Sequence, residues 1–224
     1  LTYSLEQRNF KVFPNSKTCW HFDDKIGQKY LLESIGAPLA TTDVFYDKQE
    51  AKKWLQKIEY PLVFKLRGGA SSVNVRLVKN RRQANRLTNR AFSIGFSPLD
   101  RLNMLRDKIM RFRKIKSFSN FMFIIKGILR FVFPRQNDKM LPRDKGYVYF
   151  QKYISGNSYD IRIIVIGHRA FGIKRLVRKN DFRASGSGNI VFEQNEIPLG
   201  CVKMAFDLAG KLEMQSVGFD IVFE

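Results

Sequence analysis

The residues best suited to chemistry form a short apolar segment that ends in a lysine and leads into a loop of small residues. Leu62-Val63-Phe64-Lys65 has the composition of a buried strand, and residues 68–72 read Gly-Gly-Ala-Ser-Ser. Glycine and small hydroxyl residues let backbone N–H groups approach phosphate oxygens, and a lysine at the strand end neutralises their charge. No Gly-Lys-Ser or Gly-Lys-Thr follows, so this is not a Walker loop. The segment predicts a phosphate-binding lid, with an ordinary glycine turn as the alternative.

A second segment carries groups that suit a nucleoside. Residues 151–154, Gln-Lys-Tyr-Ile, are expected to be extended, so their backbone N–H and C=O groups can pair with the edge of an adenine ring. Asp160 follows after a polar turn, and its carboxylate can accept hydrogen bonds from ribose hydroxyls. Taken alone, this segment is equally compatible with a plain strand and turn.

The composition sets the class of protein. The chain has 224 residues, of which 44% are hydrophobic and 13% aromatic, and these values are typical of a globular protein and exclude disorder of the whole chain. Cys19 and Cys201 are the only cysteines. Neither belongs to a Cys/His cluster, so the sequence predicts neither a disulfide framework nor a structural zinc site. A reducing cytoplasm fits this cysteine usage best.

Positive charge is the strongest compositional bias. The formal net charge is +20, and residues 81–145 hold seventeen basic and four acidic side chains, or +13. Within this segment, residues 102–115 place apolar side chains at helical spacing with arginine and lysine between them, which predicts a basic amphipathic helix. Charge alone leaves three interpretations open: a solvated basic face on packed helices, an anionic membrane surface, or nucleic acid.

Hydrophobic periodicity predicts helices that alternate with strands, followed by an antiparallel sheet towards the carboxyl terminus. The expected helices cover residues 24–35, 47–58, 102–115, 121–133 and 201–213, and the expected strands cover residues 42–46, 62–65, 147–150, 161–166, 170–177 and 217–223. The predicted fold class is therefore α+β. No apolar run reaches the ~18 residues that a membrane-spanning helix needs. The chain starts at Leu1 and stops at Glu224, directly after a strand, so we expect both ends to be cut from a longer protein.

Five motifs in order resemble the ATP-grasp superfamily, particularly its ribosomal-protein glutamate ligase and glutathione synthetase-like branch. They are Asp24-Lys25 with Gly36-Ala37-Pro38, the strand and lid of residues 60–75, the hinge of residues 151–154, the charged positions between 160 and 183, and Val217-Gly218-Phe219-Asp220. The resemblance implies an ATP-grasp fold of two α/β lobes that hold a nucleotide between antiparallel sheets, plus a basic helical insertion. Residues 1–23 would be the remnant of an amino-terminal substrate lobe, residues 24–150 the first lobe with the insertion at 81–145, and residues 151–224 a second lobe that is truncated at its carboxyl end.

The resemblance also implies a role for each matching residue. Arg175 and Arg183 would stabilise the transferred phosphoryl group, and Asp220 would be the first Mg²⁺ ligand. Two positions depart from the family pattern: Gln151 stands where an acid is usual, and the remaining metal ligands would lie beyond residue 224. The residues that would contact ATP are Lys25, Lys65, Gly69, Ser71, Ser72, Gln151, Lys152, Ile154 and Asp160.

The implied activity is that of an ATP-dependent ligase that joins a carboxylate to an amine or thiol through an acyl-phosphate, with ATP and Mg²⁺ as cofactors. The positive charge favours an anionic or membrane-linked acceptor, such as a cell-surface polysaccharide or peptide precursor. The alternative is a non-catalytic module of the same fold that binds a nucleotide or a polyanion. A nucleic-acid-binding protein rests on charge alone, and the absence of a recognisable RNA or DNA motif argues against it. We expect a cytoplasmic protein that associates peripherally with the inner membrane surface.

Overall fold

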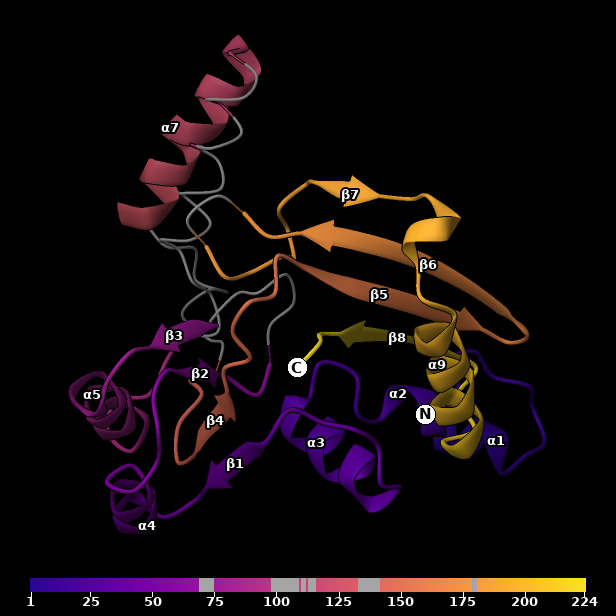
Figure 1. The fold of residues 1–224 in the computed structure, drawn as a ribbon, viewed down its shortest axis with the longest axis horizontal. Coiled ribbons are helices and arrows are strands. Elements are labelled where there is room, and N and C mark those ends of the chain that lie inside the picture. The colour runs from indigo at the N-terminus through magenta and orange to yellow at the C-terminus, as the bar shows by residue number, and fades with distance from the viewer. Residues whose placement is uncertain (69–74, 98–108, 110–111, 113–115, 133–141, 179–180) are drawn as a thin grey trace. The chain divides into compact units, whose positions relative to one another are not determined.

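The computed structural model describes residues 1–68, 75–97, 109, 112, 116–132, 142–178 and 181–224 (Figure 1). The chain forms two compact units. One contains Leu1–Asp43, Pro61–Val63 and Phe150–Glu224, and the other contains Val44–Tyr60 and Phe64–Tyr149. Helices and two four-stranded sheets alternate along the chain, so the predicted α+β class is confirmed. The division at residues 23 and 150 stays a prediction.

Three helices open the first unit: α1 (Thr2–Glu6), α2 (Ser16–Cys19) and α3 (Lys25–Ser34). Asp24 Oδ1 accepts hydrogen bonds from the backbone N–H groups of Ile26 and Gly27, at 3.2 and 3.0 Å. These bonds satisfy donors that have no partner within the helix, which is why α3 begins there. Gly36 follows with φ +66°, a left-handed conformation that favours glycine and ends the helix. The helix predicted from Asp24 is confirmed.

One sheet has the strand order β1-β4-β2-β3. The strands are β1 (Thr42–Phe45), β2 (Leu62–Lys65), β3 (Arg76–Val78) and β4 (Val148–Lys152). The apolar residues 62–64 of β2 and 148–150 of β4 are all buried, as expected for short continuous apolar runs in the interior. Lys65 therefore ends a buried strand, as the sequence predicts.

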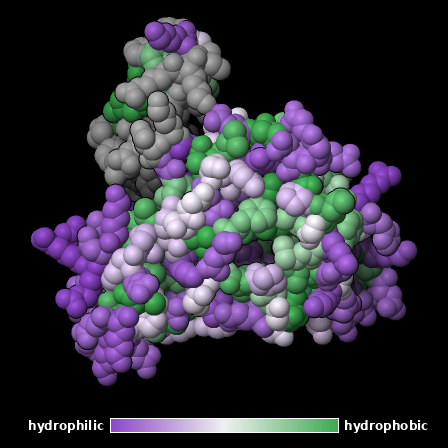
Figure 2. Space-filling view, viewed as in Figure 1, coloured by the Kyte–Doolittle hydropathy of each residue, from purple (hydrophilic) through white to green (hydrophobic). Residues whose placement is uncertain are grey.

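Two capped helices belong to the second unit. Asp47 caps α4 (Lys48–Trp54) and Asn80 caps α5 (Arg81–Ala91), each through its side-chain oxygen. The buried residues of both helices are small, and the solvent-facing sides of the helices are hydrophilic (Figure 2). Helix α7 (Phe118–Val132) covers most of the helix predicted at 121–133. The helix predicted at 102–115 lies outside the described residues, apart from Ile109 and Phe112.

The second sheet lies entirely in the first unit and has the order β7-β6-β5-β8. Its strands are β5 (Tyr159–Ile166), β6 (Arg169–Leu176), β7 (Ile190–Val191) and β8 (Ser216–Ile221), and all neighbours are antiparallel. Helix α9 (Leu199–Lys211) and the short 3₁₀ helix η1 (Gln194–Glu196) precede β8. The antiparallel pairing predicted for residues 161–166 and 170–177 and the helix before the last strand are confirmed. The strand predicted at 147–150 was expected in the same sheet, and this is wrong: it is β4 of the other sheet.

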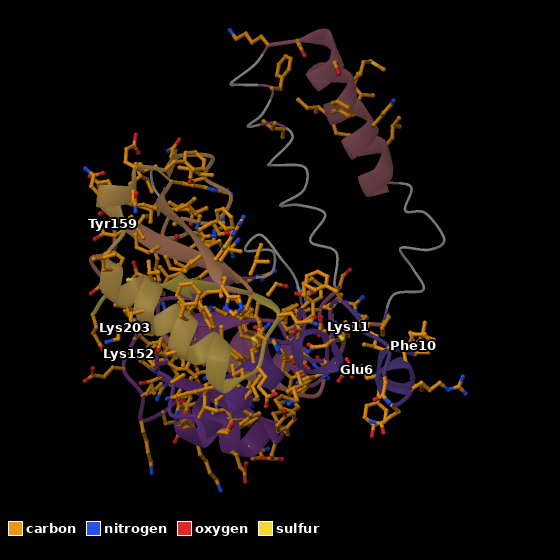
Figure 3. All side chains as sticks on the ribbon, turned by 90° about the vertical axis from the view of Figure 1, so that its right-hand side faces the viewer. Glu6, Phe10, Lys11, Lys152, Tyr159 and Lys203 are labelled. Atoms are coloured by element: carbon orange, nitrogen blue, oxygen red, sulfur yellow. The ribbon has the colours of Figure 1, made fainter. Side chains whose placement is uncertain are left out.

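The hydrophobic core of the first unit lies between one face of this sheet and α9. Ile161, Ile163 and Val165 of β5 are at most 1% exposed and pack with Ala205 and Ala209 of α9. Tyr159, at the start of β5, packs against the same cluster (Figure 3). Because successive side chains of a strand point to opposite faces, the even-numbered residues of β5 lie on the face away from this core.

Candidate functional site

The face of the second sheet opposite α9 carries four charged side chains on three neighbouring strands. Antiparallel register places Asp160 of β5 opposite Arg175 of β6, and Arg162 of β5 opposite Asp220 of β8. Asp160 and Arg162 are two residues apart on one strand, so both point away from the core. The strand pairing therefore brings two carboxylates and two guanidinium groups together.

The four side chains form one network of charge-assisted hydrogen bonds. Arg175 donates through Nε and Nη2 to the two oxygens of Asp160, at 2.6 and 2.7 Å. Arg162 donates in the same way to Asp220, at 2.6 and 2.9 Å. Arg175 Nη2 also lies 2.9 Å from Asp220 Oδ1. Paired N–H donors in a fixed planar group match the geometry of a carboxylate, so each guanidinium is held in one orientation.

Burial differs sharply across the network. The side chains of Arg175 and Asp160 are 6% and 13% exposed, whereas those of Arg162 and Asp220 are 37% and 45% exposed. Burial favours the neutral form of Arg175, but the hydrogen bonds that it donates to Asp160 and the charge of Asp220 outweigh this effect and raise the pKa of the guanidinium. The network thus presents a fixed, permanently charged arginine beside a partly exposed carboxylate.

This donor set fits a phosphate group and Mg²⁺. A guanidinium held by carboxylates supplies fixed positive charge for phosphate oxygens, and a half-exposed carboxylate is a ligand type that Mg²⁺ shares with substrate phosphates. Asp220 would then exchange one of its arginine contacts for the cation. Within the described residues, no group of three or more His, Cys, Asp or Glu side chains could hold a metal by itself. Within the described part of the chain, Asp220 would therefore be a single ligand and not part of a complete protein cage.

Three of the predicted site residues, Asp160, Arg175 and Asp220, are brought together in this network. Arg162 joins them, although the sequence predicts no role for it. Its place two residues after Asp160 in a strand is the signal that points to it, because alternate strand residues share a face. The predicted catalytic Arg183 pairs with Asp181, with Nη2 2.7 Å from Oδ2. Burial raises the pKa of Asp181, but hydrogen bonds from Arg183 outweigh this effect and lower it.

The predicted hinge residues lie at the end of β4 and just after it. Gln151 Nε2 donates to Thr42 Oγ1 at 3.0 Å, and the backbone N–H of Lys152 donates to the Thr41 carbonyl at 2.8 Å. An adenine contact from the Lys152 backbone would therefore use its carbonyl oxygen. The Ile154 carbonyl accepts a long hydrogen bond, 3.5 Å, from the side chain of Asn157.

Asn157 ties the turn after the hinge to the end of β8. Its side chain donates to the Phe223 carbonyl at 2.8 Å and accepts from the Phe223 N–H at 3.0 Å. The side chain of Lys152 forms an ion pair with Glu224 in the same region. These contacts fix the hinge segment against the terminal strand of its own unit.

The segment before the predicted lid is anchored by a buried tyrosine. Tyr147 Oη accepts a hydrogen bond from the Arg67 N–H at 2.6 Å and donates to Asp144 Oδ1 at 2.8 Å. Burial raises the pKa of Tyr147 strongly, so the phenol stays protonated and can donate. Arg67 lies two residues beyond Lys65, so Tyr147 fixes the chain between the strand and the glycine loop. The predicted lid residues Gly69, Ser71 and Ser72 lie outside the described residues.

Lys25, the remaining predicted phosphate contact, is the first residue of α3. Its Nζ lies 3.9 Å from Asp23 Oδ1, and its side chain is 22% exposed. Asp24, which precedes it, is occupied in capping the helix. The cap fixes the backbone from which the Lys25 side chain extends.

A cavity of about 260 Å³ lies in the first unit between α3, α9 and β8. Its lining includes His21, Leu32, Leu208 and Asp220. His21 is 6% exposed, and neither ring nitrogen makes a hydrogen bond of normal geometry. Burial lowers the pKa of His21, against an opposing effect of nearby backbone carbonyls, so the ring is neutral at pH 7.

Comparison with known proteins identifies the fold. The chain superposes on a RimK domain ATP-grasp protein from Sphaerobacter thermophilus with a TM-score of 0.51 and 13% identity, covering 94% of this chain and 57% of that one. The superposition on the ATP-grasp ligase PsnB in complex with Mg and ADP has a TM-score of 0.55 and 14% identity, and it covers 98% of this chain and 52% of PsnB. The superposition on D-alanine–D-alanine ligase from Bacillus anthracis has a TM-score of 0.52 and 16% identity, and it covers 100% of this chain and 60% of that ligase.

One curated protein adds a likeness in sequence. It is the phosphoribosylamine–glycine ligase of Fusobacterium nucleatum, 31% identical over 95 residues, which cover 40% of this chain and 22% of that protein. No family model matches the chain. The chain spans roughly half the length of the similar structures and about a fifth of the curated relative. Together these likenesses show that the chain has the ATP-grasp fold that its motifs predict, while the family and the branch within it stay predictions.

Proposed function

We propose that this chain is the nucleotide-binding core of an ATP-dependent ligase that joins a carboxylate to an amine or thiol through an acyl-phosphate. The observation that carries the proposal is the network of Asp160, Arg162, Arg175 and Asp220, formed on one face of a sheet in an ATP-grasp fold. Phosphoryl transfer needs fixed positive charge more than it needs covalent help from the protein. A guanidinium held by two carboxylates meets that need without reorganising during the reaction.

Each residue has a distinct part in the proposal. Arg175, oriented by Asp160, and Arg183 would both bind oxygens of the transferred phosphoryl group and of the acyl-phosphate. Both oxygens of Asp160 accept from Arg175, and their remaining lone pairs would accept hydrogen bonds from the ribose hydroxyls. Asp220 would be a ligand of Mg²⁺, which when bound offsets the charge of the phosphates.

The remaining contacts would come from the lysines, the lid and the hinge. Lys25 and Lys65 would neutralise phosphate oxygens, and the backbone of residues 69–72 would close over them. Gln151, the Lys152 carbonyl and Ile154 would hold adenine. The roles of these segments rest on their match to the family motifs and on the anchoring of Arg67 by Tyr147.

The partners follow from this chemistry. The proposed substrates are ATP, a carboxylate and an amine or thiol acceptor, and the net charge of +20 favours an acceptor that is itself anionic. A polysaccharide or peptide precursor that carries acidic groups fits this requirement. We place the reaction in the cytoplasm, where both cysteines stay reduced.

Titration calorimetry with ATP and Mg²⁺ tests the proposal. Lys65→Ala should weaken ATP binding about tenfold or more, because a charge-assisted phosphate contact contributes roughly 1.5–3 kcal/mol. Lys57→Ala is the matched control, since Lys57 is exposed in the same unit, and it should leave the affinity unchanged. Equal affinity in the Lys65 variant and the parent chain would remove Lys65 from the site.

A second measurement separates a ligase from a binding module of the same fold. A chain extended beyond Glu224 is incubated with ATP, Mg²⁺ and a panel of carboxylates and amines, and ADP release is followed. Release that depends on both substrates and falls in Asp220→Asn supports the ligase. Tight ATP binding without any substrate-dependent ADP release would support the non-catalytic module instead.

A further inference from the structure

Helix α7 differs from α3, α4, α5 and α9 in that the structure describes no buried side chain on it. Among its side chains that the structure describes, none is buried, and Phe123, Ile128 and Leu129 are 52%, 48% and 53% exposed. By contrast, α3, α4, α5 and α9 each bury at least one residue. Figure 2 shows a few green, hydrophobic side chains at the surface in the part of the molecule where Figure 1 places α7. Exposed apolar side chains on one helix mark an interaction surface.

The apolar side chains of α7 form a broad face. At about 100° per residue, Met122, Ile124, Ile125, Ile128 and Leu129 fall within an arc of roughly 160° along the helix. Ser119 and Lys126 lie outside this arc, and Phe123 lies opposite its centre. The apolar face is therefore continuous and a lysine lies beside it, which suits a helix that lies in a membrane interface.

The charge around the helix has a single sign. Residues 108–137 contain eight lysines and arginines and no acidic residue. A run of this kind attracts an anionic surface and repels another basic one. A second copy of this chain would present the same positive segment, so charge opposes covering α7 by dimerisation.

We propose that α7 inserts its apolar face into the interface of an anionic lipid bilayer and lies parallel to the membrane plane. With 15 residues the helix is about 22 Å long, shorter than the roughly 30 Å of hydrocarbon that a spanning helix must cross. No helix within the described residues is long and apolar enough to cross a bilayer. Phospholipids supply both requirements of the helix, an apolar layer for the aliphatic side chains and negative headgroups for the lysines. The inference does not depend on the ligase activity.

A nucleic acid fits this surface less well. Phosphate groups would pair with the lysines and arginines, but a duplex offers no apolar layer for five aliphatic side chains along one helix face. Aromatic stacking by Phe123 alone would leave Ile128 and Leu129 in water. The apolar face, and not the charge, thus decides between the two partners.

Vesicle co-sedimentation with the whole chain tests the proposal. The probes are vesicles with and without about a third phosphatidylserine, each at low and high salt, and a DNA duplex. We expect binding to the anionic vesicles that falls steeply with salt. Leu129→Ser should weaken it about tenfold through lost apolar burial, and Lys126→Gln about fivefold, from about 1 kcal/mol for one lysine near the surface. Ile94→Ser, at a residue 65% exposed in the same unit but outside α7, should bind as the parent does.

A fluorescence measurement reports the depth of insertion. In Leu129→Trp, brominated lipids should quench the added indole and its emission should shift to the blue on anionic vesicles. In Ile94→Trp the added indole should stay unquenched. Because Trp20 and Trp54 are present in both variants, the difference between them belongs to the new residue.

Several results would overturn the proposal. Equal binding to neutral vesicles would remove the role of anionic lipid. Tighter binding to the duplex than to vesicles would assign the surface to nucleic acid. Concentration-dependent self-association that Leu129→Ser abolishes would show that a second copy covers α7. Loss of Leu129 without any change in vesicle binding, or no binding to vesicles at all, would show that α7 does not enter a membrane.

Discussion

Removing the carboxylate of Asp160 should destabilise the first unit far more than removing the guanidinium of Arg162, although both break a bidentate ion pair. Asp160 is the partner of Arg175, whose side chain is only 6% exposed. Loss of one partner from a buried pair costs about 3–5 kcal/mol, because the other charge is left without water or a counter-ion. Arg175 would keep its 2.9 Å contact with Asp220. We therefore expect Asp160→Ala to lower the free energy of unfolding by about 2–4 kcal/mol.

The matched change in the same network is Arg162→Ala. Arg162 and Asp220 are 37% and 45% exposed, and Asp220 would still contact Arg175. Solvated ion pairs contribute about 0–1 kcal/mol, so the free energy of unfolding should fall by no more than that. Urea denaturation followed by circular dichroism measures both variants against the parent chain.

A double variant separates loss of charge balance from loss of packing. Asp160→Leu with Arg175→Met removes both buried charges and keeps the volume apolar, so it should be more stable than Asp160→Leu alone. If Asp160→Ala and Arg162→Ala lower the free energy of unfolding equally, burial does not control the energetics of this network. The same conclusion follows if the double variant is no more stable than the single one.

Three further predictions concern the supports of the site. The free energy of unfolding should fall as the pH rises above about 10, because burial raises the pKa of Tyr147 in the folded state above its unfolded value. Tyr147→Phe should remove this pH dependence and lower the free energy of unfolding by about 1–2 kcal/mol at pH 7, since it loses the hydrogen bond with Arg67. Urea denaturation across this pH range measures both effects. The free energy of unfolding should also fall as the pH drops from about 7 to 5, because the lowered pKa of His21 favours the neutral ring in the folded state. His21→Leu should reduce this pH dependence, whereas His168→Gln, at an exposed position, should leave it unchanged. Gly95→Ala should lower the melting temperature more than Gly146→Ala: both have positive φ, but a Cβ at Gly95 would lie 2.6 Å from a backbone carbonyl and one at Gly146 would meet open space.

Local features of the fold could be predicted well from the sequence. Asp24 and Asp47 mark helix starts because their side chains bond the first free N–H groups, which is a local interaction. The alternation of apolar and polar residues over positions 159–163 of β5 indicates which face is buried, because side-chain direction alternates along any strand. The order of motifs predicts the ATP-grasp fold for the same reason, since each motif fixes its own short element.

Long-range pairing could not be predicted from the sequence. Arg175 and Asp220 are 45 residues apart, and their contact depends on the register of two strands against β5. A shift of one residue in either pairing would turn one partner towards α9 and break the network. Exposure has the same origin: the sequence predicts a helix at residues 121–133, but whether its apolar side chains are buried depends on which elements pack against it. Helix periodicity is set by the local chain, whereas burial, ion pairing and exposure are set by neighbours that only the tertiary structure brings together.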